Sequence, residues 1–194
     1  ALLVKLKIRK DEQQGKLFEY QSCCTQILGY IIKNATKKTI AENANEYLWQ
    51  PLGAESDALW STDKNGIEKS FCCLNATARD FAKLGQMVLQ HGKWNQQQII
   101  DSSYLAALTS PATYLKDTKG NTCDWYGYQT WIINYEQHQI PYFRGILGQF
   151  IFMIPDKNAV IVRLGKKIKK DEDDPKYQND DIRNYIKAGL EVLQ

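Results

Sequence analysis

The chain has 194 residues, 43% of them hydrophobic and 24% charged, and a formal net charge of +3. This composition is typical of an ordinary globular chain, and the length suits one domain or part of a larger one. Because the lysines are scattered among acidic residues and no stretch approaches the ~20 apolar residues of a membrane span, the sequence argues against nucleic-acid partners and against a transmembrane helix in this segment.

The first predicted element is an apolar helix within Gly15 to Ile32. Ser22 is a competent N-cap, and apolar side chains recur at helical spacing on two adjacent rows. Tyr20 therefore lies just outside a helix N-terminus, where the helix dipole and any nearby lysine favour the phenolate and make the phenol a candidate general base. The alternative is a half-buried tyrosine whose hydroxyl contacts water. The two apolar rows consist of Cys23, Ile27 and Ile31, and of Cys24, Leu28 and Ile32.

Three further helices are predicted in the first half of the chain. Thr39 caps a helix that runs through Leu48, and an irregular loop follows from Ala54 to Ser70 with an Asn65-Gly66 turn. Thr77 starts the clearest helix, which Gly92 stops, and a short helix covers Ser102 to Leu108. The side chains expected inward are Ile40, Ala44, Tyr47 and Leu48 in the first of these helices and Phe81, Leu84, Val88 and Leu89 in the second.

The hydrophobic period then changes from helical to alternating, which predicts an antiparallel meander. Gly145 and Gly148 fall inside the second run and fit either a β-bulge or a close approach of two backbones. A final amphipathic helix, Asp180 to Leu193, would cover the sheet with Ile182, Ile186, Leu190 and Leu193, so the sequence predicts an α+β fold. The three β-rich runs are Tyr126 to Asn134, Tyr142 to Ile154 and Ala159 to Leu164.

Neither the cysteines nor the charged run predicts a metal or polyanion site. There are five cysteines, at positions 23, 24, 72, 73 and 123. Their odd number does not suggest a disulfide framework, and the absence of a Cys-x-x-Cys argues against a metal site. Most of them are therefore expected to be small buried hydrophobic residues. The run from Lys166 to Asp174 carries lysines and then acidic residues, whose charges cancel over a few positions. It predicts a solvated loop before the last helix.

Five segments, in the same order and spread over nearly the whole chain, resemble motifs of the serine β-lactamase and penicillin-binding-protein superfamily. Phe18 to Ser22 with Ile27 to Ile32 is similar to its Tyr-x-Asn or Tyr-x-Ser motif before a helix containing Leu-Gly. Trp49 to Ala54 resembles its Pro-Leu-Gly turn, Ala76 to Gly85 its Asp-Leu-Ala-x-x-Gly helix, and Gly145 to Pro155 its substrate-lining strand. The branch most resembled is that of class C β-lactamase-related hydrolases, particularly aminohexanoate-oligomer hydrolases and carboxylesterases.

The resemblance implies a β-lactamase/transpeptidase-like α+β fold that is incomplete here. Residues 1–194 are expected to form the C-terminal portion of one hydrolase domain, mainly helical over about 15–115, with antiparallel strands and a C-terminal helix over 124–194. In that family a Ser-x-x-Lys nucleophile precedes the tyrosine motif and opens a helix. The string Ser61 to Lys64 follows Tyr20 in a loop and is rejected as a chance match. The family order therefore places the nucleophile upstream of Ala1.

The same resemblance assigns roles to six residues. It makes Tyr20 the general base or proton relay and Ser22 a polar partner near the substrate. It makes Gly145 and the backbone N–H of Ile146 the oxyanion side of the site, with Gln149 as a strand-shaping or substrate-binding residue. Class C β-lactamases carry Lys-Thr-Gly on this strand, whereas this chain carries Arg144-Gly145-Ile146. That departure favours a linear amide or ester over a β-lactam, unless Arg144 replaces the lysine in binding a carboxylate.

The function expected from the resemblance is hydrolysis of a small amide or ester through an acyl-enzyme, with no metal or other cofactor. This segment alone is expected to be inactive, because its nucleophile lies in a missing N-terminal portion of the same fold. One alternative is a non-catalytic relative that binds a peptidoglycan-like or peptide ligand, and another is a structural half that docks onto a partner chain. The family also implies a periplasmic or extracytoplasmic location.

Overall fold

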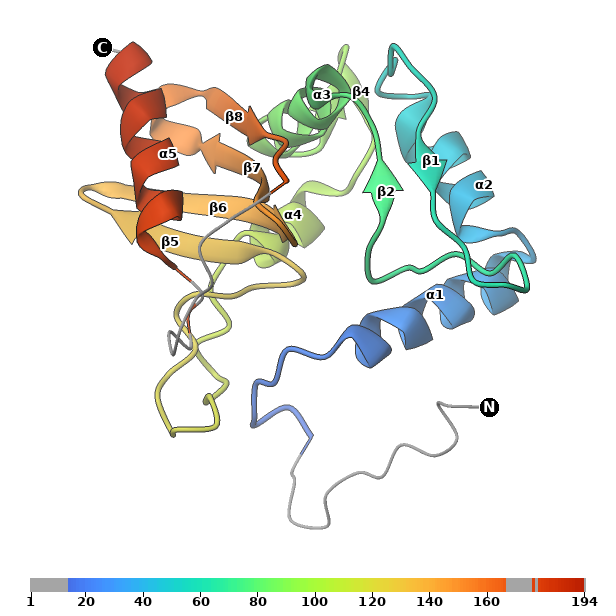
Figure 1. The fold of residues 1–194 in the computed structure, drawn as a ribbon, viewed down its shortest axis with the longest axis horizontal. Coiled ribbons are helices and arrows are strands. Elements are labelled where there is room, and N and C mark those ends of the chain that lie inside the picture. Colours follow the sequence, from blue (N-terminus) through green and yellow to red (C-terminus); the bar gives the residue numbers. More distant parts are fainter. Residues whose placement is uncertain (1–13, 167–175, 177, 194) are drawn as a thin grey trace. The chain divides into compact units, whose positions relative to one another are not determined.

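The computed structural model describes residues 14–166, 176 and 178–193. The chain divides into two compact units, each assembled from separate stretches of sequence. The first contains residues up to Ala76 together with Thr113–Cys123, and the second contains Thr77–Ala112 together with the residues from Asp124 onward. Figure 1 traces the chain through these elements. The charged run, apart from its first residue, lies outside the described residues.

Helix α1, Ser22–Thr36, begins one residue earlier than expected, so the prediction of Ser22 as N-cap is wrong. Gln21 is the N-cap residue, because its carbonyl already accepts the N–H of Cys24 at 3.2 Å while its backbone is extended. The helix ends at Lys37, whose left-handed backbone (φ 60°) directs its N–H to the Lys33 carbonyl. Tyr20 stands just before the helix, as predicted.

The apolar rows of α1 face outward, whereas its small and polar side packs on the rest of the unit. Gly29 is the buried residue of the helix, and a Cβ there would lie 2.5 Å from Ser70 Oγ. The Gln26 side chain is held by backbone groups of Glu68 and Ser70, at 3.1 and 3.2 Å. Four large aliphatic side chains are left exposed on the other side, namely Ile27 (38%), Leu28 (48%), Ile31 (56%) and Ile32 (43%).

The helix predicted from Thr39 to Leu48 is present, but its pitch changes midway. Helix α2, Ile40–Ala44, is capped by Thr39, which exchanges hydrogen bonds with Glu42 in a capping box. It continues directly as a π-helix, η2, Asn45–Trp49. Since a π turn holds more residues than an α turn, it shifts the direction of the following side chains. Tyr47, which was expected inward, is 59% exposed.

The segment from Ala54 to Ser70, predicted as an irregular loop, is wrong in part because it contains a short strand. Strand β1, Leu59–Trp60, pairs antiparallel with β2, Leu74–Asn75. The predicted turn at Asn65-Gly66 is confirmed by the left-handed Gly66 (φ 75°). The expectation for the cysteines is wrong: Cys72 and Cys73, just before β2, form a disulfide with each other, and of the other three only Cys123 is buried. An odd total number of cysteines does not exclude a disulfide between two residues that are adjacent in sequence.

The second unit contains a four-stranded antiparallel sheet of order β5-β6-β7-β8, which confirms the predicted meander. The prediction of one β-rich run from Tyr142 to Ile154 is wrong, because this segment folds back on itself as a hairpin. Gly145 pairs with Gln149 across a loop in which Leu147 and Gly148 have positive φ angles of 61° and 85°. The strands are β5, Trp131–Tyr135; β6, His138–Gly145; β7, Gln149–Ile154; and β8, Ala159–Arg163.

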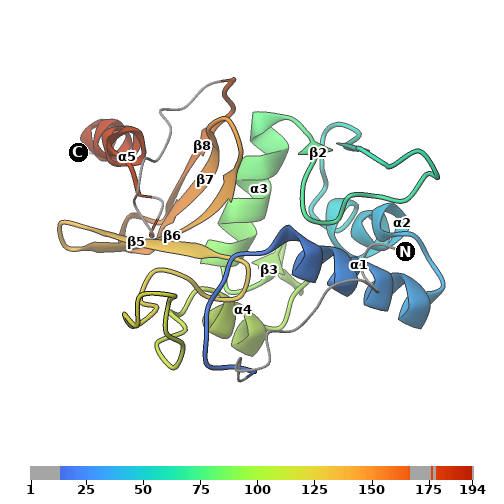
Figure 2. The same ribbon diagram turned by 60° about the horizontal axis from the view of Figure 1, so that its bottom comes forward.

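Two helices of the second unit cover the faces of this sheet (Figures 1 and 2). Helix α3, Ala78–Leu89, is capped by Thr77 as predicted and packs Gly85 against Ile151 and Val160. Helix α5, Asp180–Val192, packs Gly189 against Ile161. Since Val160 and Ile161 are consecutive in β8, they point to opposite faces, and the two helices therefore lie on opposite sides of the sheet.

The remaining elements of this unit are short. Helix α4 spans Ser102–Leu108, as predicted. Strands β3, Lys93–Trp94, and β4, Gln97–Gln98, form a two-stranded ribbon, and a 3-10 turn, η3, covers Pro155–Lys157. In α5, three of the four side chains predicted inward are buried, namely Ile182, Ile186 and Leu190, whereas Leu193 is 41% exposed.

We expect Gly85→Ala to lower the free energy of unfolding by about 1–3 kcal/mol, despite the better helix propensity of alanine. A Cβ at this position would lie 2.7 Å from Val160 Cγ1 and 2.9 Å from Ile151 Cγ2. Urea unfolding of both proteins measures the difference.

The matched control is a double-mutant cycle with Val160→Ala, which removes the obstructing methyl groups. The double variant should be less destabilised than the sum of the two single variants. Strict additivity would contradict close packing of α3 on β8.

Candidate active site

The residues predicted for the site fall in both units. Tyr20 and Ser22 belong to the first unit, whereas Arg144, Gly145, Ile146 and Gln149 belong to the second. Tyr20 is 48% exposed and lies two residues before the first residue of α1, Ser22. Ser22 is exposed and is the first helical residue.

The second part of the predicted site is the tip of the β6-β7 hairpin. The loop consists of Ile146, Leu147 and Gly148, and its first two side chains are 79% and 53% exposed. A Cβ at Gly145 would lie 3.0 Å from the Gln149 Cβ across the hairpin, so glycine avoids a tight contact there. The tip is thus exposed to solvent at the position where the sequence predicts an oxyanion donor.

Two side chains brace this hairpin tip against the end of β8. Gln149 forms a pair of hydrogen bonds with the backbone of Gly165, whose N–H donates to Gln149 Oε1 over 2.9 Å and whose carbonyl accepts from Nε2. Arg163 donates to the carbonyl of Gly148, and its guanidinium lies 4.7 Å from the Tyr185 ring centroid on α5. The amide of Gln149 is therefore engaged in shaping the hairpin.

Arg163 was missed by sequence reasoning. It lies near the end of the predicted β-rich run from Ala159 to Leu164, where the sequence gives no sign of a partner. The positive φ angles of Leu147 and Gly148 turn the loop carbonyls toward β8, and only the paired sheet brings the guanidinium to them. The one sequence signal available for this contact was the Gly-x-x-Gly of the loop. It predicts a turn but does not indicate which residue contacts that turn.

The sheet register also settles which face Arg144 occupies. Pairing through β6 is regular from Tyr142 to Gly145, without a bulge, so Arg144 shares a face with Tyr142. Tyr142 pairs with Trp131 in β5, and the Arg144 guanidinium lies 5.3 Å from the Trp131 ring centroid. Trp131 is itself buried and stacked on Trp125 at 5.6 Å. Arg144, next to the hairpin tip, thus makes a cation–π contact with a stacked pair of tryptophans.

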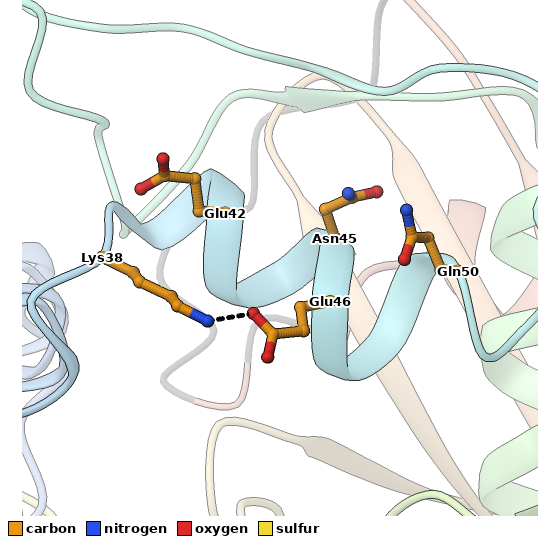
Figure 3. Close-up of a pocket in the computed structure, with 5 residues that line it drawn as sticks. All are labelled: Lys38, Glu42, Asn45, Glu46 and Gln50. Carbon is orange, nitrogen blue, oxygen red and sulfur yellow. Dashed lines mark hydrogen bonds and ion pairs between the residues drawn. The ribbon is translucent and has the colours of Figure 1, made fainter.

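A separate polar pocket of about 340 Å³ opens beside α2 and η2 (Figure 3). A hydrogen bond between Lys38 and Glu46 raises the pKa of the lysine and lowers that of the glutamate. Hydrogen bonds from Thr39 lower the pKa of Glu42. Its charged groups have protein partners, and none of the residues predicted for the site lines it, so this pocket belongs to the surface rather than to the candidate site. The lining residues are Lys38, Glu42, Asn45, Glu46 and Gln50.

The Ser61 to Lys64 string does not open a helix, which agrees with its rejection. The Ser61 backbone is paired with Cys73 and Lys69, and the Asp63 carboxylate accepts the N–H groups of Asn65 and Ile67 in the turn that follows. Within residues 14–166, 176 and 178–193, no three His, Cys, Asp or Glu side chains are grouped to hold a metal ion. In the same part of the chain, no helix is long and apolar enough to cross a membrane.

The comparisons with known proteins agree on one family. A 6-aminohexanoate-dimer hydrolase of Paenarthrobacter ureafaciens is 28% identical over 162 residues, which are 81% of this chain and 41% of that protein. A solved structure from Bacillus anthracis, assigned as a 6-aminohexanoate-dimer hydrolase, is 29% identical with a TM-score of 0.78 over 95% of this chain and 46% of that one. The chain therefore spans less than half the length of these two relatives.

More distant similarity shows the fold alone. A β-lactamase structure from Mycobacterium bovis superposes with a TM-score of 0.72 at 16% identity, over 94% of this chain and 66% of that one. The α+β, β-lactamase-like architecture predicted from the motifs is thus confirmed, and the described chain covers only part of it. The Beta-lactamase family model matches residues 6–183. The chain belongs to the Beta-lactamase family, whose relatives here are hydrolases.

Proposed function

We propose that this chain is the part of a serine hydrolase that supplies a general base and half of an oxyanion site for cleavage of a linear amide or ester. The observation that carries the proposal is the similarity over 81% of the chain to a protein named as a 6-aminohexanoate-dimer hydrolase. Since condensation of an amino group with a carboxyl group forms an amide, that name favours an amide substrate. The reaction proposed is acyl transfer: a serine attacks the carbonyl, an acyl-enzyme forms, and water releases the acid.

Tyr20 is proposed to move the proton in this reaction. What supports this role is its position in sequence just before the first turn of α1, because helix N-termini carry unpaired N–H groups and attract negative charge. A phenolate there can accept the proton of the attacking serine and return it to the leaving group. Ser22, exposed on the same first turn, is proposed as a polar contact for the substrate.

The hairpin tip is proposed to hold the developing oxyanion. The N–H of Ile146 follows Gly145 at the end of β6, in a loop braced by Arg163 and Gln149. A donor fixed in this way needs no reorganisation when charge develops on the substrate oxygen, and each such donor contributes a few kcal/mol of transition-state stabilisation. Arg144, seated on Trp131, is proposed as the cation for an anionic group of the substrate.

The nucleophile is proposed to lie in a further portion of the same fold, which would cover the exposed face of α1. The chain corresponds to 41% and 46% of its two hydrolase relatives, so both have substantial structure beyond the matched part. The exposed aliphatic residues of α1 give that portion an apolar surface to pack on, and an exposed patch of this kind marks an interaction site. The occupant we propose is therefore the complementary portion of this hydrolase fold, carrying the Ser-x-x-Lys helix.

The test is the intact mass of the protein as produced in its source organism, with and without a fluorophosphonate probe that acylates activated serines. We expect a mass well above the 22.3 kDa of this chain and a single probe adduct on a serine outside it. A mass near 22.3 kDa without an adduct would sink the hydrolase proposal and favour a non-catalytic binding or partner-chain role.

In that source protein, Tyr20→Phe should lower kcat/KM for p-nitrophenyl butyrate by roughly 10²–10⁴-fold, because it removes the proton-transferring hydroxyl and little else. Tyr47→Phe is the matched control, since Tyr47 is 59% exposed on η2 and has no proposed role. Equal activities of the two variants would remove Tyr20 from the mechanism.

The α1 face can be tested without any activity measurement. In the source protein, Ile31→Lys should lower the free energy of unfolding by more than about 2 kcal/mol, because it would bury an unpaired charge under the complementary portion. Val192→Lys is the control on an exposed helix residue and should change stability by less than about 0.5 kcal/mol. A neutral Ile31→Lys would show that this face stays open to solvent.

A further inference from the structure

We propose that Cys72 and Cys73 form a thiol–disulfide exchange site, a vicinal pair that is reversibly reduced by small dithiols and reoxidised by small disulfides. The two residues are adjacent in sequence and joined through their sulfur atoms. The site lies in the first unit, immediately before β2, and its two cysteines are not among the residues proposed for hydrolysis.

The position of the pair favours exchange. The two Cα atoms are 3.7 Å apart, as adjacency requires, whereas most protein disulfides join Cα atoms about 4.4–6.8 Å apart. A disulfide between neighbouring residues closes a very short loop, so it constrains the unfolded chain less than a disulfide that joins distant segments. Cys73 is exposed, so an attacking thiolate can reach its sulfur, and exposed disulfides are typically the labile ones.

The backbone around the pair is held independently of the sulfur–sulfur bond. The Trp60 indole N–H lies 2.8 Å from the Cys72 carbonyl and 3.1 Å from the Lys69 carbonyl. The Ser61 N–H donates to the Cys73 carbonyl over 3.0 Å. Cys73 adopts a left-handed conformation, with φ at 75°. Because these contacts do not involve sulfur, reduction can leave the two thiols side by side and ready to close again.

Cys23 and Cys24 are a second adjacent pair with which Cys72 and Cys73 can be compared. These residues are equally adjacent, yet they lie in the first turn of α1 and are not joined in a disulfide. Neighbouring side chains on a helix diverge, so this pair cannot join its sulfur atoms without breaking the turn. Adjacency alone is therefore not sufficient, and the non-helical backbone at Cys73 distinguishes the exchange site from the inert pair.

The exchange balances without any cofactor. One thiolate of a small dithiol attacks the Cys73 sulfur, the Cys72–Cys73 bond breaks, and Cys72 leaves as a thiolate that takes up a proton. The second thiol of the reagent then attacks the mixed disulfide, which releases Cys73 and yields the cyclic disulfide of the reagent. Two electrons pass from reagent to protein, and oxidation by a small disulfide reverses each step.

The test equilibrates the intact protein in buffers of reduced and oxidised dithiothreitol, blocks free thiols with N-ethylmaleimide, and measures the labelled peptides by mass spectrometry. Because both couples exchange two electrons, each tenfold change in the buffer ratio should change the dithiol-to-disulfide ratio of the 72–73 peptide about tenfold. The peptide with Cys23 and Cys24 should carry two labels at every ratio.

A Cys72→Ser variant separates the proposal from accidental oxidation. It should leave Cys73 as a thiol that labels at every buffer ratio, with the 23–24 peptide unchanged. The proposal is overturned if the 72–73 peptide of the unaltered protein stays fully oxidised in excess reduced dithiothreitol under native conditions. It is equally overturned if that peptide carries two labels at every ratio.

Discussion

Two consecutive side chains of β8, Val160 and Ile161, govern the packing of the second unit. They project to opposite faces of the sheet, and each meets a helix at a glycine: Gly85 of α3 on one side and Gly189 of α5 on the other. The absence of a side chain at both positions lets the helices approach the strand closely. With both faces covered, the middle strands can be apolar throughout, as the buried run from Phe150 to Ile154 requires.

The candidate oxyanion site depends on that packed sheet. The tip at Ile146 is a three-residue loop, and its conformation is determined by what braces it. Arg163 reaches it from the end of β8 while resting on Tyr185 of α5, and Gln149 anchors the start of β7 to Gly165. Contacts with a paired strand and a docked helix restrict the conformation of the loop, and hydrogen-bond donors held in fixed positions are the requirement for electrostatic stabilisation of an oxyanion.

In the first unit, by contrast, one apolar helix face is not covered by any other described residues. Helix α1 turns Gly29 and Gln26 to its own unit and leaves its aliphatic rows exposed. This arrangement agrees with a chain that spans less than half of its hydrolase relatives. The proposed general base stands at the start of this same helix, so the exposed face and the proposed chemistry share one element.

The sequence by itself determined the family, the types of the longer elements and most of the helix boundaries. Thr39, Thr77 and the run Ser102 to Leu108 carried local signals that needed no tertiary context, because capping and helical periodicity act within one turn. The position of Tyr20 before a helix followed from the same kind of signal. The motif order identified a β-lactamase-like hydrolase, although the roles of Tyr20, Ser22, Arg144 and Ile146 stay predictions.

Only the tertiary structure decided which way those elements face and what they touch. A helix-period pattern shows that α1 has an apolar side but not whether this chain covers it. The alternation of apolar and polar residues could not reveal that Tyr142 to Ile154 contains a turn between two strands. The same alternation continues on both sides of a hairpin that has a short loop. The contacts of Arg163 and Gln149 also join residues 15 or 16 positions apart. Such pairings depend on strand register, a property of the assembled sheet rather than of any single segment.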